Sequence, residues 1–273
     1  PQAHYAMGRW YYYRRDWPRA LAEFEAATQG LPNDSDLMSH IGFAYRRIGQ
    51  WERVFSVYRK AGQLSPKDAN LAFDMAGQTL EFVRRYEDAA VEYGRAVAMQ
   101  PDLHVARLFR GWLSIRWTGK TRVLREALDA MPEQAAVGEL HSVEAQRAAC
   151  MLMERDAAAI LLIPGVTSGG IFDGQDFLLP GALYAGWAHR LSGHESLARR
   201  EFEAALNRLD GVSKNLPDDW RVHASRGLAL AGVGRYAEAR AEARWLENCE
   251  VYRVDAFQGR LVAEERARVL AQA

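Results

Sequence analysis

Apolar residues recur along this chain at the three- and four-residue spacing of amphipathic helices. In the first such segment, Tyr5, Gly8 and Tyr11 fall on one face of a predicted helix. After a short polar turn, a second segment places Phe24 and Ala27 on a face that would pack against Gly8. Because glycine has no Cβ atom, it lets the partner helix approach closely. The pattern therefore predicts two antiparallel helices joined by a tight turn.

This helix pair repeats with a period of 34 or 35 residues. Each copy has a glycine in its first helix, an aromatic residue at the turn, an aromatic residue and an alanine in its second helix, and a proline after it. A period in this range indicates an array of stacked helix pairs, each burying its apolar face against its neighbours. The three clearest copies are Gly8, Trp17, Phe24, Ala27 and Pro32; Gly42, Trp51, Tyr58, Ala61 and Pro66; and Gly77, Tyr86, Tyr93, Ala96 and Pro101.

The repeat weakens in the middle of the chain. Residues 1–132 are expected to form an N-terminal array of four repeats, the fourth being degenerate because Pro132 comes several residues early. Residues 133–178 are expected to hold a further degenerate repeat. Its first helix is predicted over Gln134–Arg155, and a short second helix is predicted to be capped by Asp156.

The pattern resumes after a glycine-rich stretch at 164–176, which we predict to be an irregular loop and the best hinge candidate. Residues 179–273 are expected to form a C-terminal array that finishes on a lone first helix from Asp255 to Ala273. Without its partner, such a helix would leave an apolar face bare. This predicts a truncated array, and the start at Pro1 instead of Met indicates a segment of a longer protein.

These residues resemble the tetratricopeptide repeat, clearly over Pro1–Leu103 and well over Leu179–Tyr252. The resemblance implies an all-α fold, a right-handed superhelix of about seven helix pairs plus a final unpaired helix, with first helices lining the concave side. More narrowly, the stretches from Ala6 and from Ile41 are similar to the C-terminal repeat regions of bacterial multidomain signalling proteins. In those proteins the repeats follow a serine/threonine kinase, nucleotide cyclase, winged-helix DNA-binding or TolB-like domain, and no part of such a domain is present here.

On each first helix, the face opposite the packing face is expected to line the groove, and it is rich in aromatic residues and arginine. Such residues are frequent anchors of binding sites, since arginine pairs with carboxylates while the rings supply apolar area. The alternative is that some of these rings pack against neighbouring first helices. The predicted partner-binding residues are Tyr5, Arg9, Tyr12, Tyr13, Phe43, Arg46, Arg47, Gln78, Phe82, Trp112 and Arg116.

This face departs from the family members that bind the tails of heat-shock chaperones. Those members use a lysine and asparagine clamp for the tail's carboxylate, and the matching places hold Tyr5, Arg9, Ser39 and Phe43. Binding of a chaperone tail is therefore not expected.

Composition narrows the classes of ligand. The 35 basic residues are balanced by 35 acidic ones, so no nucleic-acid partner is expected. Of the basic residues, 31 are arginine, which fits either a GC-rich genome or bidentate recognition of carboxylates and phosphates. The longest apolar run, near 157–166, is too short to cross a bilayer, so no membrane insertion is expected within this segment. We expect a cytoplasmic protein, the alternative being a periplasmic part of a membrane-anchored one.

No motif of a catalytic or metal site stands out. The histidines do not pair at metal-binding spacing, and Cys150 and Cys249 are expected to be free buried thiols. The glycine-rich stretch lacks the lysine and hydroxyl residue of a phosphate loop and the carboxylates of a calcium loop. We expect no catalytic residue, no cofactor and no metal.

Two functional hypotheses follow. The first is a non-enzymatic module that binds a partner peptide or protein in a concave groove. The alternative is a regulatory or oligomerisation segment of a larger bacterial signalling protein, acting within its own chain, with homo-oligomers formed through the C-terminal helix.

Overall fold

The protein is described by a computed structural model that covers residues 1–132 and 142–273, apart from the side chains of Ala76 and Gln78. The described residues form two compact units. The first comprises Pro1–Leu124 together with Val254–Phe257, and the second comprises Arg125–Arg253 together with Gln258–Ala273. The division at 132 and 178 expected from the sequence stays a prediction.

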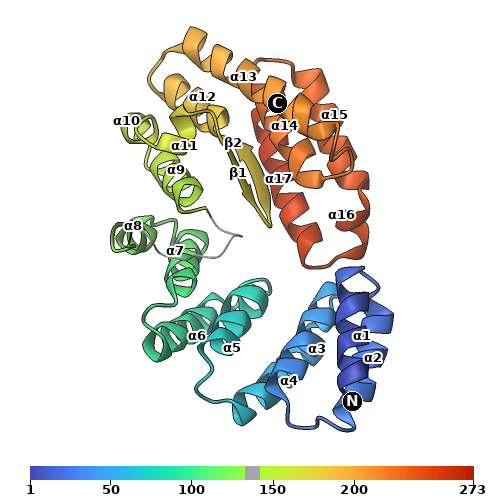
Figure 1. Ribbon diagram of the computed structural model, residues 1–273. Helices are drawn as coiled ribbons and strands as arrows, with labels where there is room; N and C mark the ends of the chain where they lie inside the picture. The colour runs from blue at the N-terminus through green and yellow to red at the C-terminus, as the bar shows by residue number, and fades with distance from the viewer. Residues whose placement is uncertain (133–141) are drawn as a thin grey trace. The chain divides into compact units, whose positions relative to one another are not determined.

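The first unit is built from antiparallel helix pairs (Figure 1). Asp16 and Asp34 cap the N-termini of two of the helices. The carboxylate of each accepts a hydrogen bond from a backbone N–H of the first helical turn. The elements are α1 (Gln2–Tyr13), α2 (Trp17–Thr28), α3 (Ser35–Arg47), α4 (Trp51–Leu64), α5 (Ala69–Met75), the π-helix η1 (Ala76–Leu80), α6 (Tyr86–Met99), α7 (His104–Thr118) and the start of α8 (Arg122–Asp129).

The predicted contact between a glycine and an aromatic ring holds the first two of these pairs together. A Cβ atom on Gly8 would overlap the ring of Phe24, and one on Gly42 would overlap the ring of Tyr58. Both rings are fully buried. Each ring therefore packs directly on helical backbone, which sets how closely the two helices of a pair approach.

The turns between paired helices share one backbone feature. In each turn a single residue takes the left-handed conformation that ends the first helix and reverses the chain. The described residues contain seven such turns, which supports the expected number of helix pairs. The residues are Arg15, Gly49, Arg84, Gly119, Arg155, Gly193 and Gly234.

The third repeat departs from the expected regular helix. Its first helix is α-helical only to Met75 and continues as the π-helix η1. The hydroxyl of Tyr93 lies where a Cβ atom of Gly77 would be and donates a hydrogen bond of 2.9 Å to the carboxylate of Glu81. The wider π turn thus faces a polar ring tip, where the first two pairs have contacts with ring carbons.

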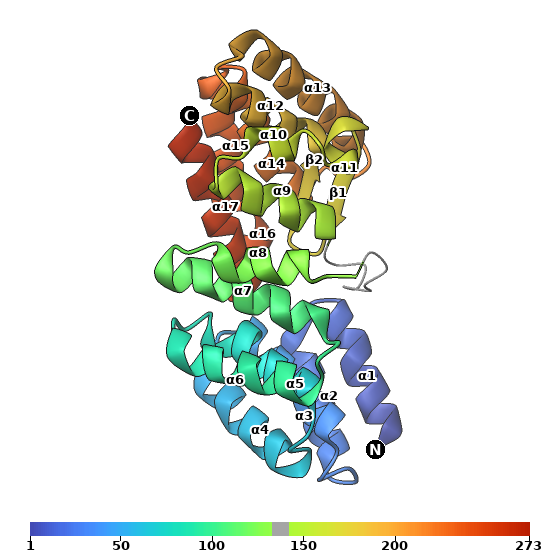
Figure 2. The ribbon, with the colours of Figure 1, turned by 90° about the vertical axis from the view of Figure 1, so that its left-hand side faces the viewer.

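The second unit begins within α8, at Arg125, and continues with the elements of the degenerate repeat (Figure 2). Asp156 caps the short helix as predicted, by accepting a hydrogen bond of 3.1 Å from the N–H of Ala159. The predicted start of the preceding helix, Gln134, lies outside the described residues. The elements are α9 (Val143–Met153), α10 (Ala157–Ile160), α11 (Pro164–Thr167), β1 (Ile171–Gly174), β2 (Phe177–Pro180), α12 (Gly181–Leu191), α13 (Glu195–Ser213), α14 (Trp220–Gly232), α15 (Tyr236–Asn248), α16 (Glu250–Val254) and α17 (Gln258–Gln272).

The prediction of an irregular loop at 164–176 is wrong. The stretch forms α11 and the first strand of an antiparallel hairpin, in which Ile171 pairs with Pro180. The hairpin lies beside α14 (Figures 1 and 2), and Ser225 donates a hydrogen bond to the carbonyl of Leu178. Glycines and acids made the stretch read as irregular, whereas Val166 and Phe172 within it are buried in the core of the second unit.

The last helix also differs from the prediction. It begins at Gln258, not at Asp255, and packs on α14 and α15. Val262 and Val269 are fully buried, and a Cβ atom on Gly227 would lie 2.8 Å from Val269. The apolar face expected to be bare is therefore covered within the second unit, which removes the basis for oligomerisation through this helix.

The glycine contact predicts opposite effects for two glycine-to-alanine substitutions. Gly42→Ala should lower the free energy of unfolding by about 1–3 kcal/mol, because the new methyl group overlaps the buried ring of Tyr58. Gly94→Ala in α6 is the matched control, since a Cβ atom there meets nothing within 4 Å. It should raise the free energy of unfolding by about 0.5–1 kcal/mol through helix propensity. Urea denaturation measures both, and effects of equal sign would contradict the packing assignment.

The carboxyl group of Asp74 in α5 predicts that the stability of the fold depends on pH. Burial raises its pKa from 3.8 to about 7, partly offset by the nearby cation of Arg46. Because the folded protein binds this proton more tightly than the unfolded chain, stability should fall as pH rises from about 4 through about 7, by at most about 4 kcal/mol.

Asp74→Asn stays neutral and should not show this fall. Thermal unfolding between pH 5 and pH 8 should therefore favour the variant over the wild type increasingly as pH rises. Asp102→Asn, at an exposed turn position, is the control and should follow the wild type. Parallel pH profiles for Asp74→Asn and the wild type would show that this carboxyl group is not responsible.

Candidate functional site

The repeat period places side chains of neighbouring first helices side by side. Residues 35 positions apart meet, as Tyr5 does with His40, Tyr12 with Arg47, and Glu81 with Arg116. In the second case the Nε of Arg47 donates a hydrogen bond of 3.2 Å to the hydroxyl of Tyr12. Contacts on this face are thus set by the repeat itself.

Five side chains on this face form what we call the arginine–aromatic site: Tyr12, Trp17, Arg46, Arg47 and Phe82. The two arginines end α3, where cations interact favourably with the helix dipole. The guanidinium of Arg47 lies 5.6 Å from the ring of Trp17 and 5.9 Å from that of Tyr12. The ring of Phe82 stacks on Trp51 of α4 at 6.4 Å.

The segment Val254–Phe257, which belongs to the same unit, lies on this site. An Oδ2 atom of Asp255 accepts a hydrogen bond of 2.8 Å from the Nη1 of Arg47. The ring of Phe257 stacks on Phe82 with centroids 4.3 Å apart and planes at 18°. The guanidinium carbon of Arg46 lies 4.0 Å from the centre of the Phe257 ring. The carboxylate of Asp255 thus pairs with a cation, and the ring of Phe257 packs against both an aromatic ring and a second cation.

The site is almost closed to solvent. Arg46 is 3% exposed, Arg47 7%, Asp255 2% and Phe257 7%. Burial lowers the pKa of Arg47, but Tyr12 and Asp255 outweigh it, so the pKa lies above its ordinary value. Removing one partner of a buried ion pair costs about 3–5 kcal/mol, because the other charge stays desolvated. An anion is therefore required wherever Arg47 is covered.

The structure places the other predicted binding residues in three kinds of position, and their role stays a prediction. Tyr5 and Phe43 are half-buried and pack with the ring of His40, at 5.4 and 5.7 Å. Arg9 and Tyr13 are exposed, and Trp112 is half-buried. Arg116 forms an ion pair with the buried carboxylate of Glu81. The side chain of Gln78 lies outside the described residues.

Sequence reasoning missed four contributors: Trp17, Trp51, Asp255 and Phe257. The two tryptophans were recognised only as turn markers, although each lies next to the end of a first helix, where the site forms. Asp255 is separated from Arg47 by 208 positions, so no local pattern links them. The one available signal was the pair of Asp255 and Phe257, an acidic and an aromatic residue two positions apart in the connection between two helices.

A second concave feature of the first unit lies among α4, α5 and α6. It is an open depression of about 810 Å³. Its lining combines apolar residues with charged side chains, including Arg59, Arg85, Glu92 and Arg95. Nothing in its lining converges on a single ligand group.

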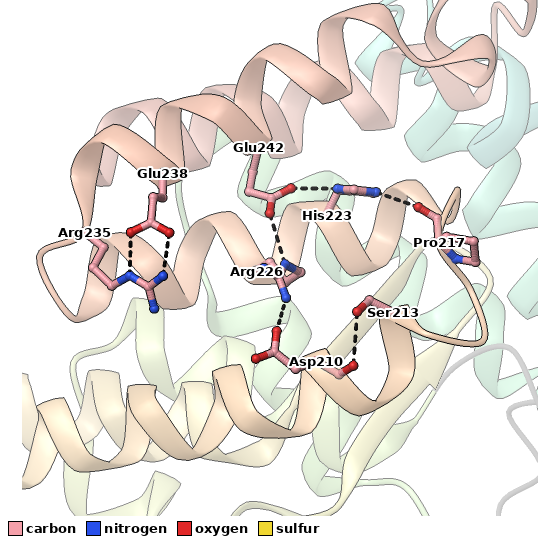
Figure 3. A network of polar contacts seen from close by, with 8 residues as sticks. All are labelled: Asp210, Ser213, Pro217, His223, Arg226, Arg235, Glu238 and Glu242. Carbon is pink, nitrogen blue, oxygen red and sulfur yellow. Dashed lines mark hydrogen bonds and ion pairs between the residues drawn. The ribbon is translucent and has the colours of Figure 1, made fainter.

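A polar network joins α13, α14 and α15 in the second unit (Figure 3). The two carboxylate oxygens of Glu242 accept separate hydrogen bonds, one from His223 at 2.6 Å and one from Arg226 at 3.0 Å. Burial raises the pKa of Glu242, but these two hydrogen bonds outweigh it and leave the pKa below its ordinary value. The ring of His223 is stacked on Trp245 at 3.5 Å. Both carboxylate oxygens are thus engaged, and the network cross-links helices.

Other groups with reactive chemistry are buried or dispersed among the described residues. Cys150 and Cys249 are free and buried as predicted, and burial raises the pKa of both thiols. Among the residues that the structure describes, no three His, Cys, Asp or Glu side chains gather to hold a metal ion. No helix in this part of the chain is long and apolar enough to span a membrane.

The chain is similar to known proteins in part of its sequence and in its fold. The sequence profile of the tetratricopeptide repeat matches residues 191–249, which include all of α13, α14 and α15. The crystal structure of a tetratricopeptide repeat protein from Parabacteroides merdae ATCC 43184 is similar with a TM-score of 0.60 and 13% identity, over 98% of each chain. At this identity the likeness shows the fold, and it confirms the predicted all-α repeat architecture.

A second crystal structure, of the type IV pilus biogenesis factor PilW, has a TM-score of 0.48 and 13% identity, over 92% of this chain and 95% of that one. That likeness is too distant to carry an argument. No curated protein matches the sequence. The profile match over residues 191–249, the repeated helix pairs with their glycine–aromatic contacts and the shared architecture together show a tetratricopeptide repeat fold.

Proposed function

We propose that the protein is an interaction module whose first unit binds an extended segment of a protein partner at the arginine–aromatic site. The observation that carries the proposal is the occupant of the site: Asp255 and Phe257 are held there by an ion pair and by ring stacking. A site that holds four residues of polypeptide in this way has the chemistry to hold a similar stretch of another protein.

The contacts support a peptide over other ligands. The Arg47 backbone carbonyl accepts a hydrogen bond of 2.8 Å from the backbone N–H of Ala256. Such a contact recognises main chain, which a peptide offers and a small anion does not. The zero formal net charge gives no general attraction for nucleic acid.

The second candidate is regulation within the protein's own chain. The observation that favours it is that the occupant of the site belongs to this chain. The narrower resemblance to repeat regions of bacterial signalling proteins agrees with such a role, and a cytoplasmic location is proposed with it.

Charge reversal at the site should abolish partner capture. We expect Arg46→Glu with Arg47→Glu to lose proteins that the wild type retains from a lysate of its own source, as identified by mass spectrometry. The matched control is Arg199→Glu with Arg200→Glu, an adjacent pair on α13 whose side chains are 68% and 71% exposed. The control should capture the same proteins as the wild type.

Because Arg46 and Arg47 are buried, folding of the variant must be checked by circular dichroism. Phe82→Ala is the second variant, since it removes the stacking surface and leaves both cations in place. Partners captured equally by the wild type and by both folded site variants would exclude this site as the binding surface.

A further inference from the structure

We propose that the arginine–aromatic site takes protein segments in which an acidic residue stands two positions before an aromatic residue, and that Val254–Phe257 is a built-in occupant that such a segment must displace. This inference rests on the proposed function. It adds a sequence pattern for the ligand and names the competitor for the site.

The burial pattern of the segment shows which positions the site reads. Asp255 and Phe257 are 2% and 7% exposed, whereas Ala256 between them and Val254 before them are exposed. Two side chains separated by one residue therefore reach the site, and the intervening one does not. The recognised unit is acidic residue, any residue with a backbone N–H, aromatic residue.

Each of the three positions has its own partner. The acidic position pairs with the Nη1 of Arg47 at 2.8 Å. The middle position donates its N–H to the carbonyl of the same arginine. This carbonyl lies at the end of α3, where helical carbonyls lack partners of their own, so it is available for an incoming chain. The aromatic position lies against Phe82 and Arg46, a ring and a cation that both favour an aromatic face.

A purely local role for Asp255 explains only part of this geometry. Its Oδ1 atom accepts a hydrogen bond of 3.0 Å from the N–H of Phe257, which forms a turn before α17. The turn leaves the Oδ2 atom unexplained, and this atom is the one bonded to Arg47. The turn also does not require the ring of Phe257 to lie on Phe82. Recognition accounts for both contacts.

A tethered occupant lowers the apparent affinity of any free competitor. If the segment fills the site nine-tenths of the time, a free peptide binds about tenfold more weakly than to an empty site. The wild-type chain should therefore bind a matching peptide poorly, and a chain whose own segment has lost its side-chain anchors should bind it well.

The experiment uses the 273-residue chain as host and a labelled peptide with the sequence of residues 252–259, its ends capped, as probe. The host variants are Asp255→Ala with Phe257→Ala, and Phe257→Ala alone, which keeps the buried ion pair. Val254→Ala, at the exposed neighbouring position, is the control host. Fluorescence anisotropy measures binding, and circular dichroism confirms that each host is folded.

We expect both anchor variants to bind the probe at least tenfold more tightly than the wild type and the Val254→Ala host. Probes with Asn for Asp or Ala for Phe should bind at least tenfold more weakly. Adding Arg47→Gln to the Phe257→Ala host should remove binding.

Equal affinity of all hosts, or no binding to any folded host, would overturn the inference. Neither result touches the proposed function. The proposed function is tested by whether the Arg46 and Arg47 reversal loses captured partners. A site that binds partners of another sequence pattern would therefore fail the peptide-binding test and pass the capture test.

Discussion

The contact between a glycine of a first helix and an aromatic ring of the second is the interaction on which the rest of this structure depends. In the first unit, the ring of Phe24 packs on Gly8 and the ring of Tyr58 packs on Gly42. A ring seated on bare backbone brings the two helices close and fixes their register, because a shift of either helix would drive a side chain into the ring. Helix pairs of uniform geometry can then stack on one another.

The arginine–aromatic site is a consequence of this stacking. With first helices side by side, residues one period apart become neighbours, and Tyr12 meets Arg47 in this way. Two arginines end the same helix, and the rings around them limit access of water. A buried cation is tolerated only beside an anion, so the site favours a ligand that brings a carboxylate together with apolar surface. Asp255 and Phe257 bring both.

The pattern of residues predicted the repeated pairs, the capping role of Asp156 and the common face of Tyr12 and Arg47. It was wrong where a local signal had two meanings. The stretch at 164–176 has the glycines of a loop, yet its apolar residues pair across a hairpin whose second strand lies beyond the predicted loop. The last helix was expected to have a bare face, but Val262 and Val269 find partners on helices that precede it by many residues.

The sequence by itself determined the helix pairs and which side chains share a face, because both follow from periodicities of a few residues and of one repeat. Only the tertiary structure decided what covers Arg47. Its partner Asp255 stands 208 positions away in a segment outside the repeat pattern. Contacts within a repeat array join residues that are close in sequence, so the period of the repeat predicts them. A segment from far along the chain has no such relation to the repeat, and no periodic pattern records its contacts.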